Sequence, residues 1–221
     1  MIHFGHMATK IIYFVRHGES MLNSQGIRQG PDGGLNEVGR EQVKQVAESL
    51  AHENKGFDVM ISSPYERAKE TSAIIAEKLG MKVEYSDLLV ERRNPSEIVG
   101  KHKDAPEVRA IVDRIDNTFH DDDLRYSDEE NFSDLKVRAR SLLAFLKERP
   151  EERLLVVTHG IFLKMFISYM LYGDRMKASD YVRLSYESDM DNAGVVICSY
   201  TTHWFRNPEW RLLLWNGVSA V

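Results

Sequence analysis

The stretch Phe14-Val15-Arg16-His17-Gly18-Glu19-Ser20 decides the fold of this chain, because a buried strand ends there in chemically active residues. The apolar run from Ile11 to Val15 predicts that strand, and an arginine, a histidine and a glycine follow it directly. In open α/β sheets, ligands bind at the carboxyl ends of the strands. Arginine forks onto phosphate or carboxylate oxygens, and histidine can attack, accept a proton or bind metal. Taken alone, the stretch could equally be a strand with a polar end.

The bulk composition narrows the classes of partner. The chain has 221 residues, enough for one large α/β domain or two small ones. Its formal net charge of −5 gives no reason to expect a nucleic acid or an anionic membrane as partner, so any anion site must be local. The single Cys198 excludes a disulfide within the chain and a multi-cysteine zinc site, and it fits a reducing cytoplasm. No apolar run approaches the roughly 20 residues of a membrane span.

The chain divides into a short leader and one domain with an insertion. Residues 1–7 are set aside as a leader or extension, and residues 8–221 are expected to form the domain. The regular pattern breaks down over residues 95–131, which we interpret as an insertion that could form a lid. Its acidic runs at 121–123 and 128–130 are typical of solvated surface, and no calcium-loop glycine accompanies them.

Strands and helices alternate on both sides of that insertion. Besides the first strand, we expect strands at 57–61, 81–85, 154–157, 194–200 and 210–215. We expect helices at 37–53, 64–79, 106–115, 133–149 and 161–172. Asn36, Ser63 and Ser133 are the expected N-caps, and Val38 belongs to the expected buried stripe of the first helix. This alternation predicts a single three-layer α/β domain with a mostly parallel central sheet and helices on both faces.

Further strand ends carry residues that complement the first one. Because parallel strands bring their carboxyl ends to one edge of the sheet, these side chains can converge there. Each residue alone is more often structural or solvated, but together they form an anion pocket that contains a nucleophile or base. Helix N-termini behind Gly18, Ser63 and Gly160 would add backbone N–H groups, and phosphate is the natural guest. Ser62 ends a third strand, with Arg67 one helical turn beyond, and the converging residues are Arg16, His17, Arg67 and His159.

With these residues in place, the sequence resembles the histidine phosphatase superfamily, which includes the cofactor-dependent phosphoglycerate mutases. Four motifs carry the resemblance in the right order, and the likeness runs from about Ile11 to the C-terminus. It implies a phosphoglycerate mutase-like fold. The motifs are Arg16-His17-Gly18, then Asn23, then the run from Ser62 to Thr71 that contains Arg67, and finally His159-Gly160.

The resemblance implies a role for each of these residues. His17 is the expected nucleophile, which forms a phosphohistidine and splits one transfer into two steps. Arg16, Arg67 and His159 are expected to stabilise charge on the transferring oxygens, His159 as an imidazolium or as a neutral donor. The remaining expected substrate-binding residues are Asn23, Gln29, Gly30 and Gly160.

The family also supplies a carboxylic acid that protonates the leaving oxygen and then activates water. Glu91 is the expected acid, because Leu89-Val90-Glu91-Arg92 resembles the family's acid segment. The alternative for Glu91 is an exposed glutamate paired with Arg92 or Arg93, and Glu97 is then the second candidate. No metal and no cofactor are expected.

Two departures from the mutase pattern favour hydrolysis. Mutases carry a Gly-Trp after the first loop, whereas Gly30 is followed by Pro31. The insertion is acidic, and none of its basic residues matches the mutases' carboxylate-binding positions. The sequence therefore predicts a phosphomonoester hydrolase for a small phosphorylated metabolite. A mutase, a protein phosphohistidine phosphatase and a non-catalytic phosphate-binding module are the alternatives. The substrate is not identified at this stage, and a homodimer is left open.

Overall fold

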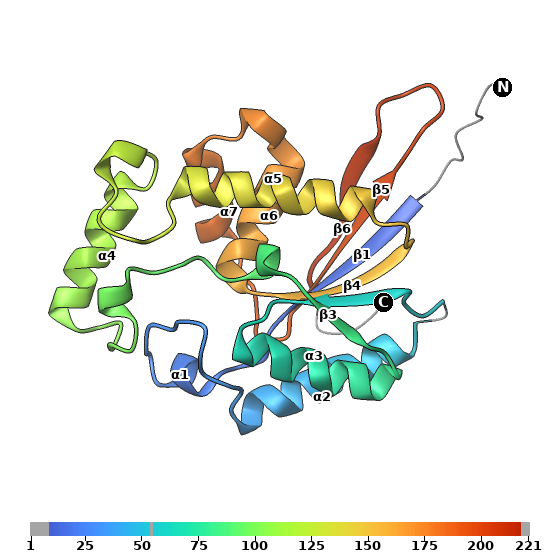
Figure 1. Cartoon of the computed structure of the whole chain (residues 1–221), viewed down its shortest axis with the longest axis horizontal. Coiled ribbons are helices and arrows are strands. Elements are labelled where there is room, and N and C mark those ends of the chain that lie inside the picture. Colours follow the sequence, from blue (N-terminus) through green and yellow to red (C-terminus); the bar gives the residue numbers. More distant parts are fainter. Residues whose placement is uncertain (1–8, 54, 218–221) are drawn as a thin grey trace.

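The computed structural model describes residues 9–53 and 55–217, so the expected leader at 1–7 lies outside the described residues. Within them, one six-stranded sheet has the order β3-β2-β4-β1-β5-β6 (Figure 1). The four strands β1 to β4 run parallel, and β5 and β6 are antiparallel to their neighbours. The strands are β1 (Thr9–Arg16), β2 (Val59–Ser62), β3 (Val83–Tyr85), β4 (Arg153–Thr158), β5 (Val195–Thr201) and β6 (Glu209–Gly217).

Helices cover both faces of this sheet. Figure 1 shows α2 and α3 on one face and α5 and α6 on the other, which confirms the predicted three-layer α/β domain. The helices are α1 (Met21–Ser24), α2 (Glu37–Ala51), α3 (Glu66–Leu79), α4 (Pro106–Thr118), α5 (Phe132–Glu148), α6 (Gly160–Tyr172) and α7 (Ala178–Glu187). Short 3₁₀ turns lie at Asp87–Leu89, Ser96–Ile98, Asp122–Leu124 and Gly173–Arg175. No helix in the described ranges is long and apolar enough to cross a membrane.

The central strand β1 is buried on both sides, which is why its sequence is a continuous apolar run. Ile12 and Phe14 pack into the core beneath α5 and α6, and Tyr13 and Val15 pack into the core beneath α2 and α3. Successive side chains of a strand point to opposite faces, so both layers need apolar residues there. The two cores hold the end of the strand, and hence Arg16 and His17, in a fixed place.

Three predicted helix details were wrong. The first turn of α3 begins at Glu66, with Tyr65 as N-cap, instead of at Pro64. The N-cap of α5 is Asn131 instead of Ser133, since the Asn131 side chain accepts from the Asp134 N–H in a capping box. On α2, Val38 is 55% exposed, and the buried stripe is formed by other apolar residues, among them Val43, Val46 and Leu50.

The insertion at 95–131 packs against the loop that follows β1. Its residue His102 forms an isolated β-bridge with Ile27 of that loop. Nearby, the Lys103 N–H donates to the Gly26 carbonyl at 2.7 Å, and the Gly100 N–H donates to the Arg28 carbonyl at 2.8 Å. These backbone bonds fix one side of the insertion over the carboxyl edge of the sheet, while α4 lies at the outer end of the molecule in Figure 1.

Candidate active site

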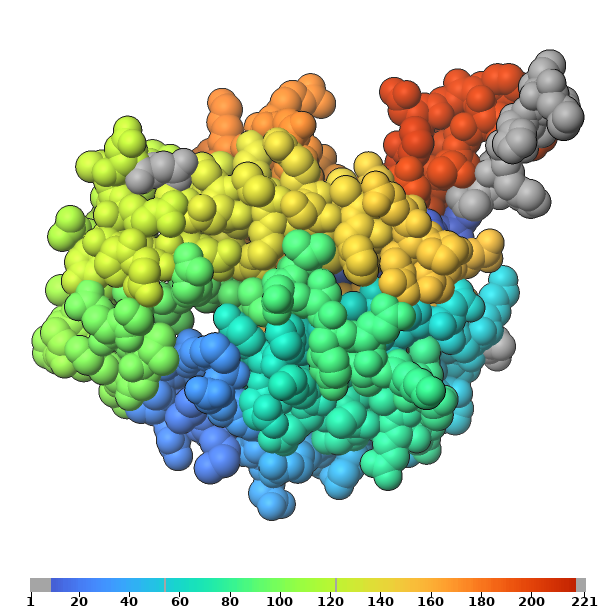
Figure 2. All heavy atoms as spheres, viewed as in Figure 1, coloured from blue at the N-terminus to red at the C-terminus, as the bar shows by residue number. Residues whose placement is uncertain are grey.

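A cavity of about 370 Å³ opens at the carboxyl edge of the parallel strands. In Figure 2 the surface is hollowed where the blue, teal and green segments meet. Its wall includes the end of β1, the helices α1, α3 and α6, and the segment before the insertion. The predicted site residues that line it are Arg16, His17, Asn23, Gln29, Arg67, Glu91 and Gly160.

The imidazole of His17 is oriented with one ring nitrogen toward this cavity. Its Nδ1 lies 2.7 Å from the Gly18 carbonyl oxygen, and a carbonyl can only accept, so Nδ1 carries the proton. The Nε2 atom then has a free lone pair, which accepts from Arg67 Nε at 3.3 Å. His17 is 4% exposed and lies in the cavity wall, so Nε2 is the ring nitrogen that could act in the predicted attack.

Burial keeps that lone pair available. The pKa of His17 lies well below 6.5 because burial disfavours the charged imidazolium, and the cations Arg67 and Arg16 add to the effect. A neutral imidazole can attack phosphorus, whereas an imidazolium cannot. The surroundings of His17 therefore favour the nucleophilic form at neutral pH.

Glycine at position 18 permits the tight packing of this strand end. A Cβ atom on Gly18 would lie 2.5 Å from the Gly39 carbonyl oxygen, closer than real side chains come. The N–H of Gly18 donates to the Thr71 hydroxyl at 3.2 Å, and Thr71 donates in turn to the Arg67 carbonyl at 2.7 Å. The residues from the motif on α3 thus hold the turn that orients His17.

Two guanidinium groups lie near His17. Arg67 is 2% exposed and donates to the Gly30 carbonyl through Nη1 at 2.9 Å, besides its contact with His17. Arg16 donates to the Met190 carbonyl through Nη1, but its buried Nε has no partner within the part of the chain that the structure describes. Since a buried cation with a free donor is costly, an anion in the cavity would stabilise it.

His159 lies beside His17 but does not line the cavity. The two ring centroids are 5.0 Å apart, and the His159 side chain is fully buried. Its Nε2 is 2.7 Å from the Ser63 hydroxyl, while Nδ1 has no partner among the described residues. Burial, followed by the charge of Arg67, lowers its pKa well below 6.5, which favours the neutral donor of the two expected forms. Contact between His159 and a phosphoryl group stays a prediction.

Glu91 reaches the cavity, supported by backbone N–H groups. Its carboxylate accepts from the N–H of Ile161 at 3.2 Å and of Phe162 at 2.9 Å, at the start of α6, and from the Arg92 N–H at 2.8 Å. The expectation that this helix start offers its N–H groups to phosphate was therefore wrong at these two positions, because Glu91 already accepts from them. Burial lowers the pKa values of Arg16 and Arg67, and the Glu91 charge opposes this.

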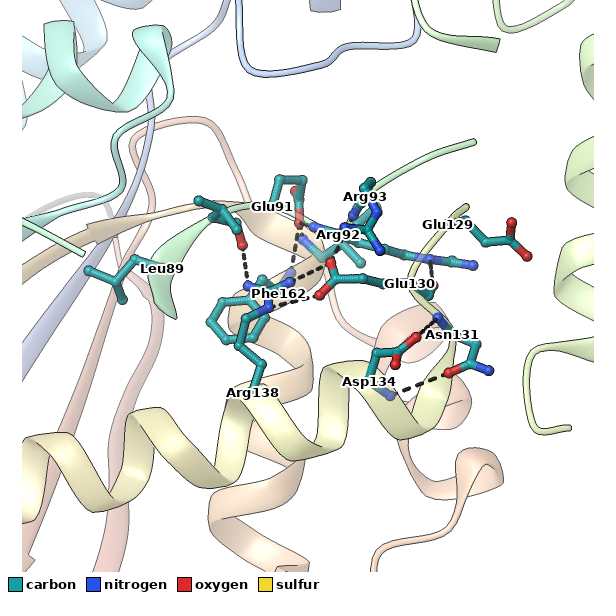
Figure 3. Close-up of polar contacts among 12 residues, drawn as sticks. Leu89, Glu91, Arg92, Arg93, Glu129, Glu130, Asn131, Asp134, Arg138 and Phe162 are labelled. Carbon is teal, nitrogen blue, oxygen red and sulfur yellow. Dashed lines mark hydrogen bonds and ion pairs between the residues drawn. The ribbon is translucent and has the colours of Figure 1, made fainter. Parts of the chain in front are cut away.

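A partly buried ion pair fixes the segment that carries Glu91, as Figure 3 shows. Arg138 of α5 donates to both carboxylate oxygens of Glu130, at 3.0 and 2.7 Å, and to the Val90 carbonyl at 2.5 Å. Its guanidinium also stacks 3.9 Å from the centre of the Phe162 ring. These contacts join α5, α6 and the segment after Leu89, so the Glu91 backbone is held from both sides.

The other predicted residues make fewer contacts at the site or lie outside it. Asn23 and Gln29 line the cavity, and the Gln29 Nε2 amide donates to Asn23 Oδ1 at 3.4 Å. Gly30 contributes only its carbonyl to Arg67 and is absent from the cavity wall. Glu97 is exposed and lies outside the cavity, so the structure does not bring it to the other residues.

Five further polar residues line the cavity without having been predicted. They are Arg28 from the loop after β1, Asn94 just before the insertion, Lys103 within it, Lys164 on α6 and Ser185 on α7. None of them ends a strand or belongs to a recognisable motif. Only the packing of the insertion, α6 and α7 shows that they belong to the site.

Comparison with known proteins gives the family whose sequence model this chain matches. The family model described as "Histidine phosphatase superfamily (branch 1)" matches residues 12–216. A probable phosphoglycerate mutase of Enterobacter sp. is 32% identical over 169 residues, which cover 72% of this chain and 74% of that protein. A probable phosphatase of Schizosaccharomyces pombe is 27% identical over 175 residues, covering 71% of this chain and 77% of the relative.

Solved structures show the same fold. The α-ribazole phosphatase of Shigella flexneri has a TM-score of 0.77 at 20% identity, covering 95% of this chain and 97% of that one. A mycobacterial glucosyl-3-phosphoglycerate phosphatase complexed with VO₃ has a TM-score of 0.71 at 24% identity, covering 94% and 98%. At these identities the likeness concerns the fold.

Proposed function

This chain belongs to the histidine phosphatase superfamily, and on that premise we propose that it is a phosphomonoester hydrolase with a phosphohistidine intermediate on His17. The observation that carries the proposal is the state of His17. Its protonated Nδ1 donates to Gly18, its Nε2 accepts from Arg67, and Arg16 lines the same cavity. This arrangement places a neutral nucleophile beside two cations that suit the three oxygens of a phosphoryl group.

In the first half-reaction, the Nε2 lone pair of His17 attacks phosphorus. The P–N bond forms, the bond to the leaving oxygen breaks, and protonated Glu91 gives its proton to that oxygen. Arg67, which points its Nε–H at Nε2 in the free enzyme, would turn this donor to a phosphoryl oxygen. Arg16 supplies its unpartnered Nε–H to the same group.

In the second half-reaction, water replaces the departed alcohol. Glu91, now a carboxylate, takes a proton from the water as the water oxygen attacks phosphorus. The P–N bond breaks, inorganic phosphate leaves, and His17 is neutral again. Burial and the two arginines favour that return, because they hold the His17 pKa down.

The competing function is a mutase, which the name of the Enterobacter relative favours. The two activities differ in the fate of the phosphoryl group. A hydrolase passes it to water, whereas a mutase returns it to a second hydroxyl of the substrate and needs priming by a bisphosphate. The absence of the mutases' Gly-Trp after Gly30 supports hydrolysis.

The test is a panel of phosphomonoesters assayed for both phosphate and isomer. We expect free phosphate from several esters without added bisphosphate, and its loss in His17→Ala. The matched control is His120→Ala, which removes an exposed histidine outside the cavity. Isomer without free phosphate would assign a mutase, and no turnover of any ester would refute both enzymatic functions.

A further inference from the structure

A second cavity of about 270 Å³ adjoins the one that holds His17. The two cavities share Arg28, Asn94, Ile161 and Ser185 in their walls, so one molecule can extend from the first into the second. With a phosphoryl group at His17, the second cavity is where the alcohol part of the substrate would lie. This step rests on the proposed function.

One part of the wall of the second cavity is apolar, beside a part that carries charged groups. Ile98, Ile115, Phe119 and Tyr181 are buried there, contributed by the insertion and by α7. Such a wall gains from burying rings or branched alkyl groups, at roughly 25 cal/mol per Å² of apolar surface. A sugar or polyol would place hydroxyls against these side chains without hydrogen-bond partners, which costs free energy.

Most charged groups in this second cavity already have partners. Arg92 stacks 4.5 Å from the centre of the Phe119 ring and donates to the Glu130 carbonyl at 3.2 Å. Arg93 donates to the Asp128 carbonyl at 2.6 Å. The carboxylate of Glu129 accepts from two backbone N–H groups, those of Tyr126 and Ser127, at 2.8 Å each.

Arg28 is different. Its buried Nε has no hydrogen-bond partner within the described residues, although Arg28 lines both cavities. Burial lowers the pKa of its guanidinium, the charge of Asp116 opposes this and that of Arg92 adds to it. An anionic ligand group would satisfy the free donor and stabilise the charge. Because Asp116 also lines this cavity, a singly charged carboxylate fits better than a doubly charged phosphate.

From these contacts we infer that the enzyme takes a phosphate monoester whose alcohol part combines an apolar, ring-sized body with a carboxylate. The phosphoryl group lies at His17, the carboxylate pairs with Arg28 where the two cavities meet, and the apolar body fills the second cavity. Arg28 and the apolar wall thus select the substrate, and the residues around His17 perform the reaction.

Two matched esters test the carboxylate. They are 3-(4-phosphonooxyphenyl)propionate and the corresponding propionamide, which has nearly the same shape without the charge. We expect the wild-type kcat/KM to be about tenfold or more higher for the acid, in line with a hydrogen bond to a charged group. In Arg28→Gln, the ratio of the two kcat/KM values should fall to about 1. In the control Arg211→Gln, an exposed arginine on β6, the ratio should keep its wild-type value.

The ratio is measured on one preparation, so it does not depend on the fraction of folded enzyme. A wild-type ratio near 1, or an unchanged ratio in Arg28→Gln, would overturn the inference while hydrolysis itself stands. If neither ester is hydrolysed while others of the panel are, the inferred substrate class is wrong; if no ester of the panel is hydrolysed, the proposed function fails instead. The same comparison is then made on binding of the two intact esters by calorimetry, where equal affinities refute the carboxylate site.

The apolar wall has its own test. Val112→Asn places an amide in the wall of the second cavity, and Val38→Asn is the matched change on an exposed face of α2. We expect Val112→Asn to lower kcat/KM severalfold for the phenylpropionate ester relative to 3-phosphoglycerate, whereas Val38→Asn should keep the wild-type ratio. A wild-type preference for 3-phosphoglycerate, or equal ratios in the two variants, would refute the apolar half of the inference.

Discussion

His17 and His159 end two neighbouring parallel strands in the same way, yet their rings have different surroundings. Strands β1 and β4 pair in register up to Arg16 and Thr158, and each is followed by a histidine and a glycine. The His17 ring uses Nδ1 for a carbonyl and leaves Nε2 toward the cavity. The His159 ring lies behind it, with Nε2 on a hydroxyl. Both rings are buried, but the same local pattern yields the proposed nucleophile in the cavity wall at one strand end and a histidine behind that wall at the other.

The largest expected effect separates the two histidines. His17→Ala should lower kcat at least about a thousandfold, because it removes the nucleophile. His159→Ala should lower it about a hundredfold, the cost of losing one charge-stabilising donor. Rapid quench at neutral pH followed by mass spectrometry should find the phosphorylated protein in His159→Ala and not in His17→Ala. Equal losses without phosphoenzyme in either variant would remove the distinction between the two strand ends.

Glu91→Gln tests the carboxyl group that we propose as the proton donor. Glu91 lies at the helix that follows His159 and in the cavity that His17 faces. We expect about a hundredfold loss of kcat with alkyl phosphates and a smaller loss with p-nitrophenyl phosphate, whose leaving oxygen needs no proton. The control is Glu97→Gln, since Glu97 lies outside the cavity. Equal losses with both leaving groups would argue against proton transfer by Glu91, and full activity on phosphohistidine would favour the phosphohistidine phosphatase.

Ser63→Ala tests whether His159 needs its hydrogen-bond partner. The Ser63 hydroxyl is the hydrogen-bond partner of His159 Nε2, so its loss frees the ring to turn. We expect kcat to fall about three- to tenfold with little change in KM, the usual worth of one neutral hydrogen bond. Ser141→Ala, on the exposed side of α5, is the control. A Ser63→Ala enzyme with wild-type kcat would show that His159 needs no such support.

The smallest expected effect is on stability against pH. Both histidines have pKa values well below 6.5 in the folded protein, so the unfolded chain binds protons first as the pH falls. Above 6.5 both states are neutral and the stability is unaffected. Below it, each histidine should lower the free energy of unfolding by up to about 1.4 kcal/mol per pH unit until its folded pKa is reached.

Urea titrations at several pH values between 7.5 and 5 measure this dependence. Carboxylates also titrate in that range, so the informative quantity is the difference in slope between the wild type and His17→Gln. We expect the variant to lose stability less steeply below pH 6.5. Parallel slopes would mean that His17 has an ordinary pKa in the folded protein.

Much of the fold could be predicted from the sequence, because the patterns that indicate strands and helices are local. Apolar runs buried on both faces produce strands at 11–15 and 154–157, and both proved to be central strands of one sheet. The N-cap of α5 was misassigned because Asn131 and Ser133 are both good caps, and only the capping box with Asp134 distinguishes them. The helix α7 was not expected at all.

Part of the site could also be predicted from the sequence, for a different reason. Residues at strand ends, such as Arg16 and His17, follow from the rule that parallel strands share an edge, and Arg67 follows from the motif. The place of Glu91 rested on a resemblance, and the structure puts its carboxylate at the start of α6, 70 positions along the chain. Arg28 could not be predicted, since no local sequence pattern distinguishes a loop arginine whose Nε–H has no partner in the described part of the chain.

The sequence by itself determined which side chains arrive at the carboxyl edge of the sheet, because strand periodicity and chain direction fix that locally. It also determined the glycine beside His17, where a side chain would collide with the Gly39 carbonyl. Only the tertiary structure decided which histidine lines the cavity, which N–H groups hold Glu91, and which arginine Nε–H groups have no partner among the described residues. These depend on contacts between segments far apart in the chain, whose geometry follows from how the layers pack.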